Sequence, residues 1–110
     1  MIEQKGLTPD PGKTGTVERK AILVCGNVQG VGYRKFAALQ AVNLNLGGFC
    51  RNLISGEVEI EIEGPAGRIA ELIERLRQGP PRGSVDRLTV LPIPPKNETE
   101  FRVFLEQEPT

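Results

Sequence analysis

The 110-residue sequence contains no histidine, no tryptophan, one tyrosine and two cysteines. The absence of histidine excludes Ser-His and Cys-His catalytic pairs and zinc sites with histidine ligands. Aromatic side chains make up 5% of the chain, which argues against a sheet surface that stacks the bases of a nucleic acid. Any chemistry of this protein must therefore depend on other groups.

The two cysteines are too few for a disulfide framework, and no N-terminal apolar stretch is typical of a signal peptide or a membrane span. We therefore expect a monomer of the reducing cytoplasm with no membrane partner. Cys25 cannot begin a Cys-x5-Arg phosphatase loop, because Val31 stands where the arginine is required. Cys25 and Cys50 are expected to be small packing residues inside strands.

The formal net charge is zero, with 14 basic and 14 acidic residues. This balance argues against a protein whose whole surface binds nucleic acid or anionic lipid. The charges are nevertheless unevenly distributed. Residues 17–52 contain five basic residues and one acidic residue, a net charge of +4, whereas residues 53–110 contain seven and eleven, a net charge of −4. The first of these segments is the better place to hold an anion.

The length allows one domain. Residues 1–16 show no periodicity and are expected to form a flexible leader, with the domain spanning residues 17–110. A helix is predicted over residues 34–45, and a second one opens at Gly64-Pro65 and ends at Gly79. Strands are predicted at residues 17–25, 49–54, 57–63, 84–91 and 101–105.

Hydrophobic periodicity predicts which faces are buried. In the first helix, Phe36, Leu39 and Val42 are expected to face inward. Residues 57–63 alternate strictly between glutamate and apolar residues, which predicts one dry face and one solvated face whose glutamates pair with Arg or Lys across the ladder. In the second helix, the apolar stripe consists of Ile69, Leu72, Ile73 and Leu76.

The order β-α-β-β-α-β, with the final strand split in two, predicts an α+β fold of the ferredoxin-like sandwich type. In this architecture two helices cover one face of a mostly antiparallel sheet. The same fold serves metal chaperones, RNA binders and enzymes, so the fold alone does not select a function.

The loop at residues 26–34, Gly-Asn-Val-Gln-Gly-Val-Gly-Tyr-Arg, joins the first strand to the first helix. Its three glycines allow successive backbone N–H groups to face one side, and a helix N-terminus favours an anion. The guanidinium of Arg34 can hold two phosphate oxygens at once. The glycine spacing fits neither a P-loop nor a dinucleotide-binding loop. On glycine content alone, a tight turn with an exposed arginine is an equally good interpretation.

The string GNVQGVGYRKF, followed by LNLGGFCRNLISGEVEIEIEG, resembles the acylphosphatase family. The family signature joins a Val-Gln-Gly-Val-x-Phe/Tyr-Arg loop to a Gly-x-x-Arg-Asn-x-x-x-Gly-x-Val hairpin, and the resemblance runs from about Ala21 to Val103. It implies the same ferredoxin-like sandwich. It also implies hydrolysis of the carboxyl-phosphate bond of small acyl phosphates by water attack on phosphorus. Inorganic phosphate would be product and inhibitor, and no metal or other cofactor is implied.

The resemblance also assigns roles by position. Arg34 and Asn52 would be the catalytic residues, with Arg34 binding the phosphate and Asn52 orienting the attacking water. Ala37 stands where the family often has Thr, and Ser55 where it often has Asp, but neither departure affects the two catalytic positions. The backbone amides that would bind the phosphate are those of Gln29, Gly30, Val31, Gly32, Tyr33 and Arg34.

A second hypothesis is a non-catalytic or weakly catalytic module of the same fold that binds phosphate or carbamoyl phosphate. Acylphosphatase-like domains also form the front section of larger hydrogenase-maturation carbamoyltransferases. Because the chain ends at Thr110 with no following domain, we expect the free enzyme. No nucleic-acid partner is expected, since the glutamate-rich third strand does not suit an RNA-binding sheet.

Overall fold

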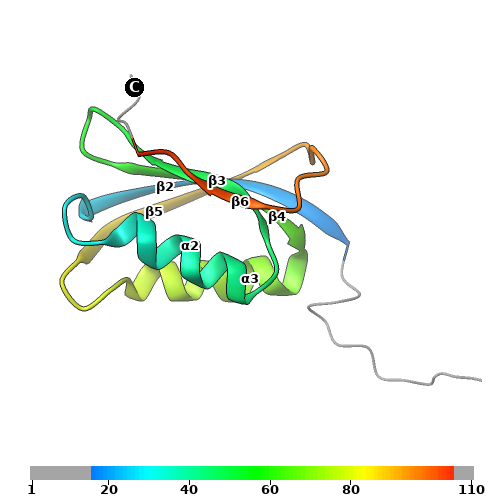
Figure 1. The fold of residues 1–110 in the computed structure, drawn as a ribbon, viewed down its shortest axis with the longest axis horizontal. Coiled ribbons are helices and arrows are strands. Elements are labelled where there is room, and N and C mark those ends of the chain that lie inside the picture. The colour runs from blue at the N-terminus through cyan, green and yellow to red at the C-terminus, as the bar shows by residue number, and fades with distance from the viewer. Residues whose placement is uncertain (1–15, 106–110) are drawn as a thin grey trace, which may run out of the picture.

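The computed structural model describes residues 16–105, which form a five-stranded sheet with both helices on one face (Figure 1). The predicted leader, residues 1–16, lies outside the described residues except for Thr16. The sheet order is β5-β2-β4-β3-β6, in which β3 and β6 are parallel and the other neighbours are antiparallel. The predicted ferredoxin-like α+β class is therefore confirmed. The elements are β2 (Val17–Asn27), α2 (Tyr33–Asn43), β3 (Gly47–Asn52), β4 (Val58–Pro65), α3 (Ala66–Gln78), β5 (Ser84–Ile93) and β6 (Phe101–Val103).

The core lies between the sheet and the two helices. Val58, Ile60 and Ile62 of β4 are fully buried against the helical layer, as the alternation of residues 57–63 predicts. The α3 stripe is also confirmed, with Ile73 partly buried beside three fully buried side chains. Burial of these aliphatic groups supplies the main driving force for packing α3 on the sheet. The three fully buried α3 residues are Ile69, Leu72 and Leu76.

The buried face of α2 differs from the prediction. Leu39 and Val42 are 57% and 59% exposed, and only Phe36 of the expected residues is partly buried. Apolar spacing selects Phe36, Leu39 and Val42, whereas two alanines at i and i+4 bring α2 close to the sheet. The residues that α2 buries are Tyr33, Ala37 and Ala41.

Gly47 and Gly48 begin β3, whereas the strand is predicted to begin two residues later, at residue 49. Gly48 has φ +132°, and a Cβ at this position would overlap the carbonyl oxygen of Glu61. Glycine therefore allows the backbone of β3 to approach β4 at this point.

The final strand is not one strand split in two, because β5 and β6 lie at opposite edges of the sheet (Figure 1). The prediction of a single interrupted strand is wrong in this respect. Pro92, which follows the strand predicted at residues 84–91, lies inside β5, and an edge strand tolerates proline there. The connection at residues 94–100 returns the chain to β3, where Phe104 N–H donates to Cys50 O at 3.0 Å.

A buried ion cluster fastens this connection to the sheet. The Arg19 side chain is fully buried and lies 2.8 Å from each of the carboxylates of Glu61, Glu63 and Glu98. The backbone N–H groups of residues 96–97 donate to Glu63 at 2.9 and 2.8 Å. Burial alone would raise the pKa of Glu63, but these N–H groups and Arg19 outweigh it and hold the pKa below its usual value of 4.5. At 3% exposure, Glu63 does not belong to the solvated glutamate face that the alternation predicts.

Candidate active site

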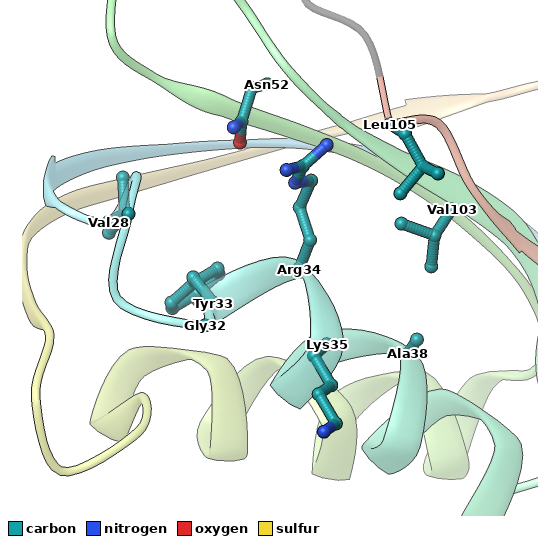
Figure 2. A pocket seen from close by; sticks show the side chains of 10 residues that line it. Val28, Gly32, Tyr33, Arg34, Lys35, Ala38, Asn52, Val103 and Leu105 are labelled. Carbon is teal, nitrogen blue, oxygen red and sulfur yellow. The ribbon is translucent and has the colours of Figure 1, made fainter.

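A cavity of about 400 Å³ lies at the N-terminus of α2, bordered by the loop that follows β2 and by the ends of β3 and β6 (Figure 2). This volume is in the range of small-ligand pockets, about 300–1,000 Å³. The cavity brings together Arg34 and Asn52, which are 18 positions apart in the sequence. Its lining consists of Val28, Gly30, Gly32, Tyr33, Arg34, Lys35, Ala38, Asn52, Val103 and Leu105.

Two glycines shape the side of the cavity nearest the loop. Gly30 and Gly32 have φ +77° and +80°, and a Cβ at either position would meet no other heavy atom within 4 Å. Gly32 is the N-cap of α2, whose described N-terminus has no side-chain cap and no acidic residue in its first turn. The first N–H groups of a helix have no intrahelical partner and attract anions. This end of α2 is therefore suited to a phosphate.

Arg34 lies in the first turn of α2 and is held from two sides. Its Nη1 donates to the backbone oxygen of Phe104 at 2.6 Å, which fixes the guanidinium beside the end of β6. The buried thiol of Cys50 donates to the backbone oxygen of Arg34 at 3.7 Å. Burial raises the pKa of Cys50 to about 12, so this thiol stays protonated and acts as a packing group, as expected.

Asn52 is the last residue of β3 and is 8% exposed. Within residues 16–105, its side-chain amide makes no hydrogen bond to another protein group. Figure 2 shows the Asn52 amide and the Arg34 guanidinium directed toward each other across the cavity. A neutral amide and a fixed cation thus face the same space from different elements.

Gln29 connects the loop to the hairpin formed by β3 and β4. Its Nε2 donates to the backbone oxygen of Leu53 at 2.8 Å and to that of Glu57 at 2.9 Å. Leu53 directly follows Asn52, so Gln29 links the loop to the strand end that carries Asn52. The sequence suggests a role only for the backbone amide of Gln29, and this side-chain role is found in the structure.

Four of the six residues whose backbone amides are expected to bind phosphate line the cavity, namely Gly30, Gly32, Tyr33 and Arg34. Gln29 and Val31 are absent from its lining, and Val31 packs against the core. Tyr33 lies at the cavity, but its side chain is 1% exposed and its hydroxyl donates to Leu76 O at 2.7 Å. Burial raises the pKa of Tyr33, so its side chain serves packing.

Several lining residues were not found from the sequence. Ala38 follows Arg34 by one helical turn, and this i, i+4 spacing could have indicated it. Val103 and Leu105 could not have been identified, because their position depends on the pairing of β6 with β3 across a separation of about 50 residues. Val28 is the first residue of the loop motif and Lys35 directly follows its last residue, Arg34.

Two further observations concern other site types. Among residues 16–105, no group of three or more His, Cys, Asp or Glu side chains is arranged to hold a metal ion. In the same part of the chain, no helix is long and apolar enough to cross a membrane.

Comparisons with known proteins agree on one family. A family model described as acylphosphatase matches residues 20–103. An acylphosphatase of Chlorobaculum tepidum is 44% identical over 90 residues, which cover 81% of this chain and 98% of that protein. The crystal structure of acylphosphatase from Bacillus subtilis has a TM-score of 0.78 and 30% identity, and the match covers 81% of this chain and 99% of that one.

A longer protein contains the same fold. Full-length HypF in a phosphate- and nucleotide-bound form has a TM-score of 0.80 and 28% identity, and the match covers 89% of this chain and 13% of that one. The fold, the loop and hairpin motifs, and similarity to acylphosphatases over most of both chains lead to one assignment. The chain belongs to the acylphosphatase family.

Proposed function

We propose that this enzyme hydrolyses the carboxyl-phosphate bond of small acyl phosphates. Water attacks phosphorus, the bond between phosphorus and the carboxyl oxygen breaks, and the carboxylate leaves with the electron pair. The second product is orthophosphate. This reaction has a good leaving group, so the protein must mainly position the reactants and hold the charge on the phosphoryl oxygens.

Phosphate binding is assigned to Arg34 and the uncapped start of α2. The planar guanidinium can donate hydrogen bonds to two phosphoryl oxygens at once, while the backbone N–H groups of residues 29–34 donate to the remaining phosphoryl oxygens. The left-handed conformations of Gly30 and Gly32 support this assignment, since they turn the loop without side chains that would fill the cavity. Product phosphate would bind the same groups, and we therefore expect it to inhibit.

We assign to Asn52 the role of orienting the attacking water. Its amide can accept a hydrogen bond from water and donate one to a phosphoryl oxygen, but it is not basic enough to remove a proton. The proton lost by water passes to a phosphoryl oxygen of the substrate and stays on orthophosphate. The chemistry thus needs neither histidine nor a resident cofactor.

The observation that carries the proposal is the convergence of Arg34 and Asn52 on one cavity at an uncapped helix N-terminus. A charge-assisted hydrogen bond contributes about 1.5–3 kcal/mol, so the loss of a bidentate arginine should slow the reaction about a thousandfold or more.

The test is a continuous absorbance assay of benzoyl phosphate hydrolysis in the presence of a chelator. Arg34→Ala should retain the wild-type circular dichroism spectrum and lose about a thousandfold in kcat/KM, with inorganic phosphate inhibiting the wild-type protein. In ¹⁸O-labelled water the label should enter orthophosphate, and its appearance in benzoate would contradict attack on phosphorus. A folded Arg34→Ala variant with the wild-type rate would contradict the assignment of Arg34.

We further propose that the protein is a monomer of the reducing cytoplasm. The free thiols of Cys25 and Cys50 are compatible with such a compartment, and light scattering coupled to size exclusion tests the oligomeric state. The alternative of a binding module predicts phosphate-induced shifts of the amide resonances of residues 29–34 without turnover of any acyl phosphate.

A further inference from the structure

The active-site cavity extends beyond the space that a phosphate needs. Its volume is about 400 Å³, compared with about 30 Å³ for the share of one water molecule in the liquid. A phosphoryl group at Arg34 and the helix N-terminus would fill only part of it. The remainder must accommodate the acyl group of the substrate or water.

One wall of the cavity is aliphatic and comes from the end of the chain that the structure describes. Val103 and Leu105 alternate with Phe104, so their side chains share one face of the extended segment. Figure 2 shows both side chains on the side of Arg34 away from Asn52. Ala38, one turn after Arg34 on α2, forms the adjoining wall. Three apolar side chains therefore border the space next to the phosphate-binding arginine.

The hydrogen bond from Arg34 Nη1 to Phe104 O fixes the position of this wall relative to the phosphate. It is 2.6 Å long and joins the guanidinium to the residue between Val103 and Leu105. An in-line displacement places the leaving oxygen on the side of phosphorus opposite the attacking water. Asn52 and the aliphatic wall lie on different sides of Arg34 (Figure 2). A phosphoryl group bound between them and attacked by water from the side of Asn52 would therefore direct its acyl group toward Val103 and Leu105.

The chemistry of the wall also limits the acyl group. None of the ten described residues that line the cavity carries a negative charge, and two of them, Arg34 and Lys35, are cations. Figure 2 shows the Lys35 amino group directed away from Arg34, so it does not face the aliphatic wall. Leu105 is 80% exposed and therefore contributes little to the core, but it could cover an apolar ligand.

We infer that Ala38, Val103 and Leu105 form an acyl-binding subsite that selects acyl phosphates with an uncharged apolar acyl group over the smallest ones. This inference rests on the proposed function. Each fully buried methylene is worth about a fourfold change in binding, and the cavity is open on one side. Two added methylenes should therefore raise kcat/KM about fourfold rather than the roughly sixteenfold of complete burial.

The experiment compares acetyl phosphate with butanoyl phosphate. Their leaving carboxylates have similar basicity, so the ratio of their kcat/KM values reports contacts with the acyl chain. The wild-type ratio of butanoyl to acetyl phosphate should be about four and should fall toward one in Leu105→Asn. Adding Val103→Thr, which keeps the shape of the side chain, should bring the ratio to about one. The control is Leu39→Asn, because Leu39 is an exposed leucine of α2 outside the cavity, and its ratio should stay at about four.

The outcomes separate the subsite from the proposed function. If the wild-type protein hydrolyses neither substrate, the proposed function is overturned and the subsite with it. If it hydrolyses both with a ratio near one, or if Leu105→Asn keeps the wild-type ratio, the subsite alone is overturned. A reduced ratio in Leu105→Asn together with an unchanged ratio in Leu39→Asn supports it.

Discussion

The two hydrogen bonds of the Gln29 side chain give a prediction for Gln29→Ala. They join the loop that carries Gly30 and Gly32 to the backbone oxygens of Leu53 and Glu57, at 2.8 and 2.9 Å. Each such bond contributes about 0.5–1.5 kcal/mol, so their loss should cost about 1–3 kcal/mol of unfolding free energy. Both oxygens also accept backbone hydrogen bonds within the hairpin, at 3.0 and 2.8 Å, which favours the lower half of this range.

The loss of these bonds should also slow catalysis. Without Gln29, the loop and the strand end that carries Asn52 are no longer joined by a side chain, and we expect kcat to fall about tenfold, equivalent to about 1.4 kcal/mol. The measurements are urea unfolding and steady-state hydrolysis of benzoyl phosphate. The matched control is Gln40→Ala, which removes a hydrogen bond of 2.8 Å from Arg75 of α3, outside the cavity, and should leave kcat unchanged. Wild-type kcat in a folded Gln29→Ala variant would refute the reasoning.

Three further predictions concern the sheet and the buried thiol. Arg19→Met removes the buried cation that three carboxylates share, although Glu61 and Glu98 keep Lys96 and Arg102 as exposed partners. It leaves buried Glu63 without a cation and should lower the unfolding free energy by about 3–5 kcal/mol in urea titrations; a loss below 1 kcal/mol would contradict this. Because the folded-state pKa of Glu63 lies below 4.5, stability should be fully present above that pH and decline as the pH falls below it. Glu63→Gln should weaken this decline, and an identical pH profile would count against it. Cys50, with a pKa raised to about 12, should resist iodoacetamide at pH 8 until the protein unfolds, as followed by mass spectrometry, and rapid alkylation of the native protein would be incompatible with its burial.

The sequence predicted the parts of the fold that depend on local patterns. The alternation of residues 57–63 identified the buried side of β4, and the periodicity of α3 identified its core stripe. The same reasoning failed at α2, because Ala37 and Ala41 are small enough to pack close to the sheet while the larger Leu39 and Val42 stay exposed. The spacing of large apolar residues does not by itself determine which side of a short helix faces the sheet.

Features that depend on contacts between distant parts of the chain were harder to predict from the sequence. The connection that leads to β6, at the edge opposite β5, is held by the ion pair of Arg19 and Glu98, which are 79 residues apart in the sequence. For the candidate site, the motifs single out Arg34 and Asn52, which the structure brings to one cavity, but the aliphatic wall of Val103 and Leu105 exists only because β6 pairs with β3. Sequence reasoning could therefore indicate the chemistry of the site but not the surroundings of the acyl group.

The central claim is that Asn52 directs the water attack while Arg34 and the loop hold the phosphate. Its most direct test is benzoyl phosphate hydrolysis by the wild-type protein and Asn52→Ala side by side, with the inhibition constant of inorganic phosphate measured for both. Removal of one preorganised polar group at a reacting centre typically costs about 10²–10³ in kcat. We predict a loss of that size in Asn52→Ala with an inhibition constant within about twofold of wild type. A folded Asn52→Ala variant that retains the wild-type kcat would contradict the account.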